Sequence, residues 1–460
     1  MIHVHLIGIG GTGISSIARV LLERGYKVSG SDRVLSPLAM ELQAVGVTVY
    51  EGHQAANIQG ADLVVRSSAI PDDNTEVQAA LASGIPVMKR AEFLGDLMAD
   101  DFSIAVAGSH GKTTTSAMMA WALTSLQQDP TYILGGVSNN LKTNAHAGSG
   151  KYFVIEADEY DRMFLGLNPD VALLTNVGYD HPDCFPTVNA YESAFRDFIR
   201  KTKPGGMVVA CEPDAKRLHL IDDLPATIHG ITFGFSRDAD YRAMNLEMND
   251  RGCFNFDVFA SNGGKQLAVV SMSIPGEHNV LNALGVFSAL HQLGFDANQI
   301  ALALGSFLGT GRRFEIVGEV SGVTVVDDYA HHPAKIKATL AAARNRFPGR
   351  RIIAVWQPHT FSRTKALAPE FAAAFENADM VLVSEIYASR EKMEAYSSNE
   401  VVKSITNADA RYIASLPEIS SFLIHEVRSE DVIIVLSAGD ANQVCNDVLS
   451  ALQERKGYNG

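Results

Sequence analysis

The stretch Ala105-Val-Ala-Gly-Ser-His-Gly-Lys-Thr-Thr-Thr115 decides how the middle of this chain folds. Residues 104–107 are typical of the end of a buried strand, residues 108–111 form a glycine-bounded loop, and an apolar helix follows. Backbone amides of such a loop and of the helix start can bind phosphate oxygens. We therefore expect a nucleoside triphosphate to be bound by Gly108, Ser109, His110, Gly111, Lys112, Thr113 and Thr114.

Two side chains of this loop have specific expected roles. Lys112 would reach the β- and γ-phosphates, and the hydroxyl of Thr113 would ligate Mg²⁺. The usual phosphate-binding loop has its first glycine where this chain has Val106, so the loop here is the shorter G-x-x-G-K-T. The alternative is an ordinary strand–turn–helix connection containing a lysine, and the strand and helix on either side argue against it.

Length and composition favour a large protein with several globular domains. At about 150 residues per domain, the chain is long enough for roughly three domains. It is 47% hydrophobic and 20% charged, as ordinary globular proteins are. The net charge is −14 and there is no long basic run, which argues against nucleic acid as the main partner.

The cysteines and the apolar segments indicate the cell compartment. Four scattered cysteines without C-x-x-C spacing are typical of reduced thiols in a cytoplasmic protein, and they are Cys184, Cys211, Cys253 and Cys445. The chain begins directly in a strand pattern, and its apolar runs fall short of the ~18 residues that a spanning helix needs. We expect a cytoplasmic monomer or weak homo-oligomer with no membrane partner.

A second glycine motif stands near the N-terminus. Gly8-Ile-Gly-Gly-Thr-Gly13 follows an apolar strand and opens a helix, and its glycines permit a tight turn, close approach of a diphosphate and helix–strand packing. Asp32 ends the next strand, about where a ribose-binding acid would lie. NAD, another diphosphate nucleotide and a ligand-free packing turn all fit this pattern. Because no second domain looks built for hydride transfer, we favour a diphosphate ligand other than NAD.

Two strands after the phosphate loop end in polar residues. The apolar strand that begins at Tyr152 runs into four acids, and the strand at 171–177 runs into Gly178-Tyr-Asp-His181. The acids are Glu156, Asp158, Glu159 and Asp161. Metal–nucleotide enzymes hold Mg²⁺ with acids in such places, whereas the alternative is a solvated acidic loop. Short alternating strands from about Ile231 to Ile274 then predict an antiparallel insertion.

The last third of the chain again follows the pattern of a parallel α/β sheet. Gly309-Thr-Gly-Arg-Arg-Phe-Glu315 predicts a hinge, because glycines flank the arginines. Polar residues follow three later strands, in Asp327-Asp-Tyr-Ala-His-His-Pro333, Gln357-Pro-His-Thr-Phe-Ser-Arg363 and Ser437-Ala-Gly-Asp440. Open α/β sheets bind ligands at these carboxyl ends.

In their order along nearly the whole chain, these motifs resemble those of the Mur ligases of peptidoglycan synthesis. The motifs are G-x-G-x-x-G, GSHGKTTT, EADEYD, TNVGYDH, GEHNVLNA, GTGRRFE, DDYAHHP, QPHTFSR and AGD. The resemblance implies an α/β protein of three domains. These are a Rossmann-like UDP-sugar domain (1–99), a central ATP-binding domain with a mostly parallel sheet (100–312), and a Rossmann-like domain (313–460) that binds the amino acid and closes on ATP.

The resemblance also implies a reaction. ATP would phosphorylate the lactoyl carboxylate of UDP-N-acetylmuramate, and the amine of L-alanine would attack the acyl phosphate. A transferring phosphoryl group needs cations around it, and Lys112 together with Mg²⁺ on Thr113, Glu156 and His181 would supply them. Members of the family often carry an acidic residue at the position of Gly178.

Further residue roles follow from the same resemblance. Asn279 would lie by the adenine, and Arg313, Asp328 and His331 would close on the nucleotide. His359 and Arg363 would lie near the amino acid, with Arg363 suited to pairing its carboxylate. The UDP-sugar would be bound by Gly8, Gly10, Gly13, Ser31, Asp32, His53 and Ser67.

Four other functions remain open at this point. A tripeptide-recycling ligase belongs to the same family, but GTGRRFE and HTFSR favour addition of alanine. A folylpolyglutamate synthetase would not need the N-terminal glycine motif. An NAD-dependent oxidoreductase leaves Lys112, Glu156 and His181 without a role, and a non-catalytic UDP-sugar sensor leaves the ATPase motifs without one.

Overall fold

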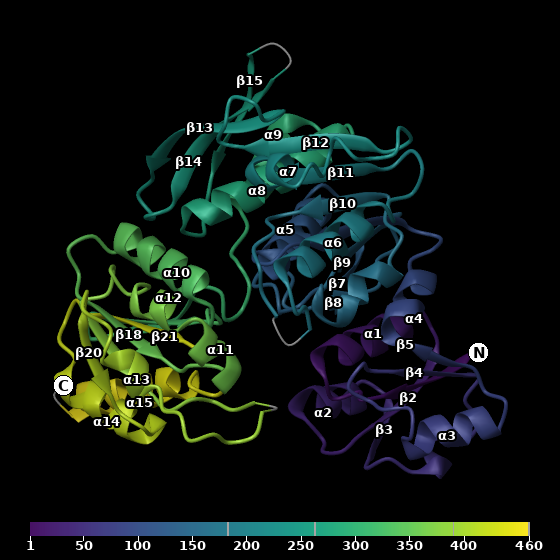
Figure 1. Cartoon of the computed structure of the whole chain (residues 1–460), viewed down its shortest axis with the longest axis horizontal. Helices are drawn as coiled ribbons and strands as arrows, with labels where there is room; N and C mark the ends of the chain where they lie inside the picture. The colour runs from purple at the N-terminus through teal and green to yellow at the C-terminus, as the bar shows by residue number, and fades with distance from the viewer. Residues whose placement is uncertain (182–183, 262–263, 390, 459–460) are drawn as a thin grey trace. The chain divides into compact units, whose positions relative to one another are not determined.

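A computed structural model describes residues 1–181, 184–261, 264–389 and 391–458. In the described residues, three mostly parallel β-sheets follow one another along the chain (Figure 1). The chain divides into two compact units. Unit 1 comprises residues 1–246, 256–271 and 280–308, and unit 2 comprises residues 247–255, 272–279 and 309–460.

The first sheet has the strand order β3-β2-β1-β4-β5 and is parallel throughout. The order reverses between β1 and β4, and such a switch point opens a ligand crevice at the carboxyl ends of the strands. Its elements are β1 His3–Ile7, α1 Thr12–Glu23, β2 Lys27–Asp32, α2 Pro37–Ala44, β3 Thr48–Glu51, η1 Ala55–Ile58, β4 Leu63–Arg66, α3 Thr75–Ala82, β5 Val87–Lys89 and α4 Arg90–Leu97.

The second sheet has the order β15-β14-β13-β12-β11-β10-β6-β9-β7-β8. Strand β6, which carries the phosphate loop, lies between β10 and β9, and its apolar residues are buried because helices cover both faces of a parallel sheet. The elements up to β10 are β6 Phe102–Ala107, α5 Lys112–Ser125, β7 Thr131–Ile133, β8 Ala145–His146, β9 Tyr152–Glu156, η2 Tyr160–Gly166 and β10 Val171–Leu174.

The rest of this sheet differs in one respect from expectation. Strand β12 pairs in parallel with β11 and with β13, so the parallel part extends past Ile231, where an antiparallel insertion was expected to begin. The remaining elements are α6 Val188–Ile199, β11 Met207–Cys211, α7 Glu212–Arg217, β12 His229–Gly234, β13 Tyr241–Met248, β14 Phe254–Ala260, β15 Gln266–Ser271, α8 Glu277–Gln292 and α9 Ala297–Gly305.

The third sheet, in unit 2, has the order β16-β17-β21-β18-β19-β20, with only the β16–β17 pair antiparallel. Apolar clusters cover both of its faces. Its elements are β16 Glu315–Val320, β17 Val323–Asp328, α10 Pro333–Arg346, β18 Ile352–Trp356, α11 Phe361–Ala366, α12 Ala368–Ala372, β19 Met380–Val383, α13 Asn399–Val402, β20 Asp409–Tyr412, α14 Leu416–Glu426, β21 Val432–Leu436 and α15 Gln443–Tyr458.

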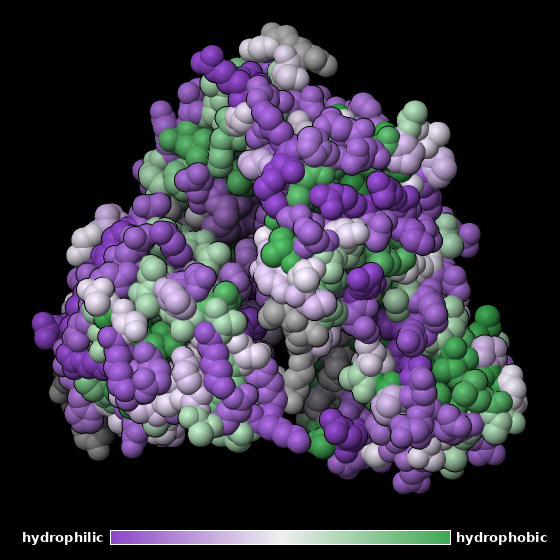
Figure 2. Space-filling model, viewed as in Figure 1, coloured by the Kyte–Doolittle hydropathy of each residue, from purple (hydrophilic) through white to green (hydrophobic). Residues whose placement is uncertain are grey.

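The surface carries mainly hydrophilic residues on the face shown in Figure 2, with hydrophobic residues in small groups. Among the described helices, none is long and apolar enough to cross a membrane. The three-domain α/β fold expected from the sequence is confirmed by the three successive sheets.

Candidate active site

The phosphate loop of unit 1 is held by residues that follow β10. The backbone N–H of Ser109 donates to the Asn176 carbonyl at 3.0 Å, and the N–H of His110 donates to the Asn176 side chain at 3.0 Å. Thr175 Oγ1 in turn donates to the His110 carbonyl at 2.5 Å. The loop amides of Ser109 and His110 are therefore engaged by protein, which leaves the amides that begin α5, at 111–114, as phosphate donors.

Glycine is required at two points of this loop. Gly108 has a φ of +140°, and a Cβ there would lie 2.1 Å from Thr175 Oγ1. Gly111, the N-cap of α5, has a φ of +83°, and a Cβ there would lie 2.7 Å from Asn282 Oδ1. These positions favour glycine because other residues rarely adopt positive φ.

Lys112 forms an ion pair with Glu159. In the sequence, Glu159 is only one of four acids near the end of a strand. The Nζ of Lys112 donates to the Gly108 carbonyl at 2.8 Å and to Glu159 Oε2 at 2.5 Å, and Glu159 is fully buried. Burial alone would lower the pKa of Lys112, but the nearby charges of Glu159, Asp158 and Glu156 raise it above its usual value. Lys112 therefore keeps its positive charge at the loop.

Glu159 also connects the loop to His181 and Tyr191. Its Oε1 lies 3.7 Å from His181 Nε2 and 3.4 Å from the Tyr191 hydroxyl, and that hydroxyl is 2.7 Å from Ser109 Oγ. Burial, followed by the charge of Glu159, raises the pKa of Tyr191, so Tyr191 stays a neutral phenol. Ser109, Glu159 and Tyr191 are buried and His181 is partly exposed, and the four side chains form one polar cluster at the phosphate loop.

The expected metal ligands occupy two places. Thr113 and Glu156 both lie against Gly135–Gly136: the Gly135 N–H donates to Glu156 Oε2 at 2.9 Å, and a Cβ on Gly136 would lie 3.2 Å from Thr113 Cγ2. His181 instead faces Glu159, and its buried Nδ1 has no hydrogen-bond partner. Across the residues that the structure describes, no three His, Cys, Asp or Glu side chains form a metal-binding group.

The donor atoms nevertheless suit Mg²⁺. A hydroxyl and a carboxylate are the oxygen ligands that this ion takes, usually together with water and substrate phosphates rather than an all-protein cage. Thr113 and Glu156 therefore fit a magnesium nucleotide, and the unpartnered nitrogen of His181 could take a further ligand.

The N-terminal residues expected at the UDP-sugar lie at the carboxyl ends of β1 to β4. The Gly8 turn touches Ser67, because a Cβ on Gly8 would lie 3.1 Å from Ser67 Cβ. Asp32 accepts a hydrogen bond from the Gly10 N–H at 2.9 Å. Ser31 Oγ lies 3.0 Å from His53 Nδ1. The strand ends thus bring these residues, together with Gly13, to one edge of the sheet.

Arg90 is a residue of this edge that the sequence reasoning missed. It begins α4 directly after β5, and its guanidinium lies so close to Gly13 that a Cβ there would be 2.1 Å from Nη1. Its Nε is buried without a hydrogen-bond partner. The available signal was its place after the last strand of the sheet, where a cation would face the glycine turn.

In unit 2, a second group of expected site residues lies at the carboxyl ends of β17 and β18. Asp328 accepts the N–H groups of Phe314 and Ala330, both at 2.7 Å; burial raises its pKa, and Arg313 opposes that rise. The Arg313 guanidinium lies 4.9 Å from the centre of the Tyr329 ring.

The two histidines expected in this unit lie together. The rings of His331 and His359 are 5.6 Å apart, and Arg363 Nη1 lies 3.5 Å from His359 Nδ1. Arg363 is buried although it belongs to the short helix α11. Asn279 lies apart from this group in the sequence, and its Nδ2 donates to the Pro275 carbonyl at 2.7 Å.

Comparison with known proteins gives matches along the chain. Sequence models match residues 3–102 (Mur ligase family, catalytic domain), 106–290 (Mur ligase middle domain) and 312–439 (Mur ligase, glutamate ligase domain). UDP-N-acetylmuramate–L-alanine ligases of Caldanaerobacter subterraneus subsp. tengcongensis and Chlorobium phaeovibrioides are 41% and 42% identical, over 96% and 97% of this chain and 96% of each relative.

Solved structures of related ligases are also similar to this chain. The UDP-N-acetylmuramate–alanine ligase of Thermotoga maritima superposes with a TM-score of 0.83 at 30% identity, covering 99% of this chain and 100% of that one. A murein peptide ligase of Psychrobacter arcticus superposes with a TM-score of 0.71 at 27% identity, covering 98% and 99%.

Proposed function

Because the chain belongs to the Mur ligase family, we propose that it joins L-alanine to the lactoyl carboxylate of UDP-N-acetylmuramate, with conversion of ATP to ADP and phosphate. It is an ATP-dependent ligase of peptidoglycan precursor synthesis. The observation that carries the substrate assignment is the full-length identity of about 40% to relatives with this activity in their names. The phosphate loop supports it, because Lys112 is held charged beside the amides that begin α5.

We assign the ATP end of the reaction to unit 1. The amides at 111–114 and Lys112 would bind the phosphates, and Lys112 would stabilise the charge that develops as the γ-phosphoryl moves. Thr113 and Glu156 would hold Mg²⁺, with His181 as a further ligand, and when bound this ion would neutralise phosphate charge. Glu159 orients Lys112 through their ion pair.

We assign the residues that close on the nucleotide and those that bind the amino acid to unit 2, which includes Asn279. Arg313, Asp328 and His331 would meet the nucleotide, and Asn279 the adenine. The histidine–arginine group of His359 and Arg363 would bind the amino acid, since a buried guanidinium is well suited to a carboxylate. The chain crosses between the two units several times, and its last crossing, between Leu308 and Gly309, supports our proposal of a hinge at 309–313. We propose domain boundaries at 99/100 and 312/313.

A tripeptide-recycling ligase is the second candidate. The murein peptide ligase of Psychrobacter arcticus supports it as a structural relative, although at a lower identity and TM-score than the alanine ligase of Thermotoga maritima. We favour the alanine ligase because curated relatives at 38–42% identity, over nearly the full length of this chain, are named for that activity.

We expect ADP release to require UDP-N-acetylmuramate and to be fastest with L-alanine. The enzyme should be assayed with ATP and Mg²⁺ against L-alanine, glycine, L-serine and the tripeptide L-alanyl-γ-D-glutamyl-meso-diaminopimelate, with product mass measured in each case. Selection by differential binding of one methyl group is worth about 1–3 kcal/mol, so glycine should be slower by roughly 10- to 200-fold. Faster release with the tripeptide than with L-alanine would assign the recycling activity instead.

Arg90→Ala is expected to weaken binding of UDP to the N-terminal domain by about 10- to 100-fold, because one charged hydrogen bond to the diphosphate is worth about 1.5–3 kcal/mol. Calorimetry with UDP measures this directly. Arg24→Ala is the matched control: Arg24 pairs with Asp101 at the C-terminal end of α1, and its loss should change UDP affinity by less than about twofold. Tight NAD binding without UDP binding would contradict the assignment of the glycine motif.

A further inference from the structure

One carboxylate in the N-terminal domain is fully buried and has no part in the reaction described above. Glu76 lies in the first turn of α3, where an acidic residue is usually solvent-exposed and interacts with the helix dipole. Here its exposed fraction is 0%. Burying a carboxylate costs free energy unless several donors hydrogen-bond to it. The hydrogen-bond partners of Glu76 therefore indicate its role.

Those partners come from the ends of two strands. Glu76 Oε2 accepts the Ser31 hydroxyl at 2.5 Å, at the end of β2. Glu76 Oε1 accepts Asn57 Nδ2 at 2.6 Å and the Gln54 N–H at 3.2 Å, both after β3. His53 Nδ1 lies 3.5 Å from Oε2. One side chain of α3 thus fixes the end of β2 and the segment 53–57.

A chain of polar side chains from β1 and β2 leads to the Glu76 carboxylate. His5 Nε2 lies 3.5 Å from Glu76 Oε2, and Ser29 Oγ joins the rings of His5 and His3 at 2.8 Å and 2.7 Å. Although burial alone would raise the pKa of Glu76, hydrogen bonds from His5, Ser31 and Asn57 hold it below its usual value. Glu76 therefore stays a charged acceptor at neutral pH.

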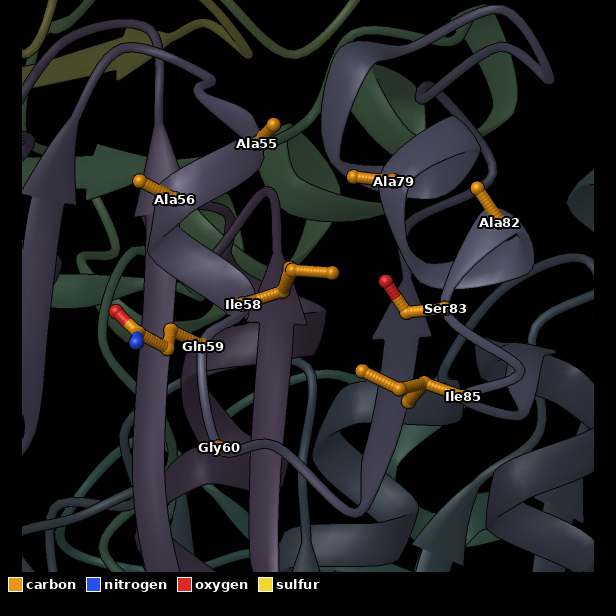
Figure 3. A pocket seen from close by; sticks show the side chains of 9 residues that line it. All are labelled: Ala55, Ala56, Ile58, Gln59, Gly60, Ala79, Ala82, Ser83 and Ile85. Carbon is orange, nitrogen blue, oxygen red and sulfur yellow. The ribbon is translucent and has the colours of Figure 1, made fainter.

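The network lies beside, and not within, the apolar groove between η1 and α3. Figure 3 shows Ile58 and Ala79 facing that groove, towards the C-terminal end of α3. Ile58 also packs with Ile7 and Val77 in a small core on this face of the sheet. Apolar contacts therefore hold η1 against α3 in addition to the charged network.

We propose that Glu76 is a positioning residue of the UDP-sugar site, which holds the buried Ser31 and, directly and through Ser31, orients the partly exposed His53 towards the ligand. This inference rests on the proposed function, since Ser31 and His53 are two of the residues assigned to the UDP-sugar. Glu76 acts through them: Ser31 Oγ lies 3.0 Å from His53 Nδ1, and both groups share the Glu76 Oε2 atom. Asn57 extends the same control to the turn after β3 through the Gly52 carbonyl at 3.1 Å.

The test compares Glu76→Gln with the natural protein in the full chain. Glu76→Gln keeps the size of the side chain but removes the charge and replaces one acceptor by a donor. We expect KM for UDP-N-acetylmuramate and Kd for UDP to rise about tenfold, because small displacements of positioning groups have large effects. KM for ATP and for L-alanine should change by less than about twofold.

Asn74→Ala is the matched control. The Asn74 side chain caps α3 by accepting the N–H groups of Glu76 and Val77, so its loss lowers Tm through the same helix while the carboxylate contacts remain. We expect KM for UDP-N-acetylmuramate to stay within about twofold in this variant. An equal rise of that KM in Asn74→Ala and Glu76→Gln would show a merely structural role and overturn the proposal, as would an unchanged KM in Glu76→Gln.

Two further measurements keep the outcomes distinct. If Glu76→Gln does not fold, Asn57→Ala removes one partner of the carboxylate, and it should raise Kd for UDP several-fold; unchanged affinity would then overturn the proposal. If the natural protein itself neither binds UDP nor turns over UDP-N-acetylmuramate, the proposed function fails, whereas UDP binding that is unaffected by these substitutions rejects only the role of Glu76.

Discussion

Lys112→Ala is expected to lower kcat for ligation by about 10²- to 10³-fold or more, the usual effect of removing a charge that stabilises a transition state. The structure gives the reason. The ammonium is held at the loop by the Gly108 carbonyl and by Glu159, and the charges of Glu159, Asp158 and Glu156 raise its pKa despite burial. It is therefore a fixed cation, positioned before the nucleotide arrives.

The same substitution should also destabilise the protein, by about 3 kcal/mol, because Glu159 would be left buried without its cation. Steady-state kinetics must therefore be read together with a thermal melt and with UDP titration of the N-terminal domain, where affinity should be unchanged. Lys203→Ala is the matched control: Lys203 pairs with Asp170 at 2.9 Å, just before β10 and so at the amino edge of the same sheet. Normal turnover in Lys112→Ala would reject the phosphate-loop assignment.

Much of the architecture could be predicted because strand patterns and glycine turns are local. The strand before Gly8, the strand before Gly108 and the helices after them all occur where the apolar periodicity places them. The position of polar residues at strand ends followed from the same periodicity, since carboxyl ends of parallel strands lie at one edge of a sheet.

The choice of partners within the site could not be predicted, because it depends on the path of irregular segments. Four acids lie at or after the end of β9, and the one that meets Lys112 is Glu159, beyond the strand and just before the η2 segment. In η2 both Asp161 and Arg162 have left-handed φ values, 53° and 52°, which the sequence does not signal.

The burial of individual charged side chains also could not be predicted from the sequence. In sequence, Glu76 is an acid in the first turn of a helix, a pattern that ordinarily indicates a solvated charge. Its burial depends on His5 from β1 and Ser31 from β2, which are 71 and 45 residues away. Arg90 was missed for the same reason, since its proximity to Gly13 is set by the packing of α4 and not by any local motif.

Gly108→Ala is expected to lower kcat/KM for ATP by about 10²-fold or more. Gly108 has a φ of +140°, and the added Cβ would lie 2.1 Å from Thr175 Oγ1 and 3.0 Å from the Asn176 carbonyl. Strain of this kind costs about 1–3 kcal/mol. Because Thr175 and Asn176 also hold His110, relief of the overlap must move the loop, and a shift of about 1 Å at a positioning element costs about 10²-fold in rate.

Gly178→Ala provides the control in the same neighbourhood. The Gly178 N–H donates to Ser109 Oγ at 2.8 Å, yet a Cβ at position 178 would meet nothing within 4 Å. The same methyl group should therefore be tolerated there, with kcat/KM for ATP within about twofold of the natural protein. UDP affinity should be unchanged in both variants, because the first sheet carries that ligand in our proposal. If Gly108→Ala keeps normal kinetics for ATP, the loop does not contact the nucleotide; if both variants lose activity equally, the steric argument at Gly108 is wrong.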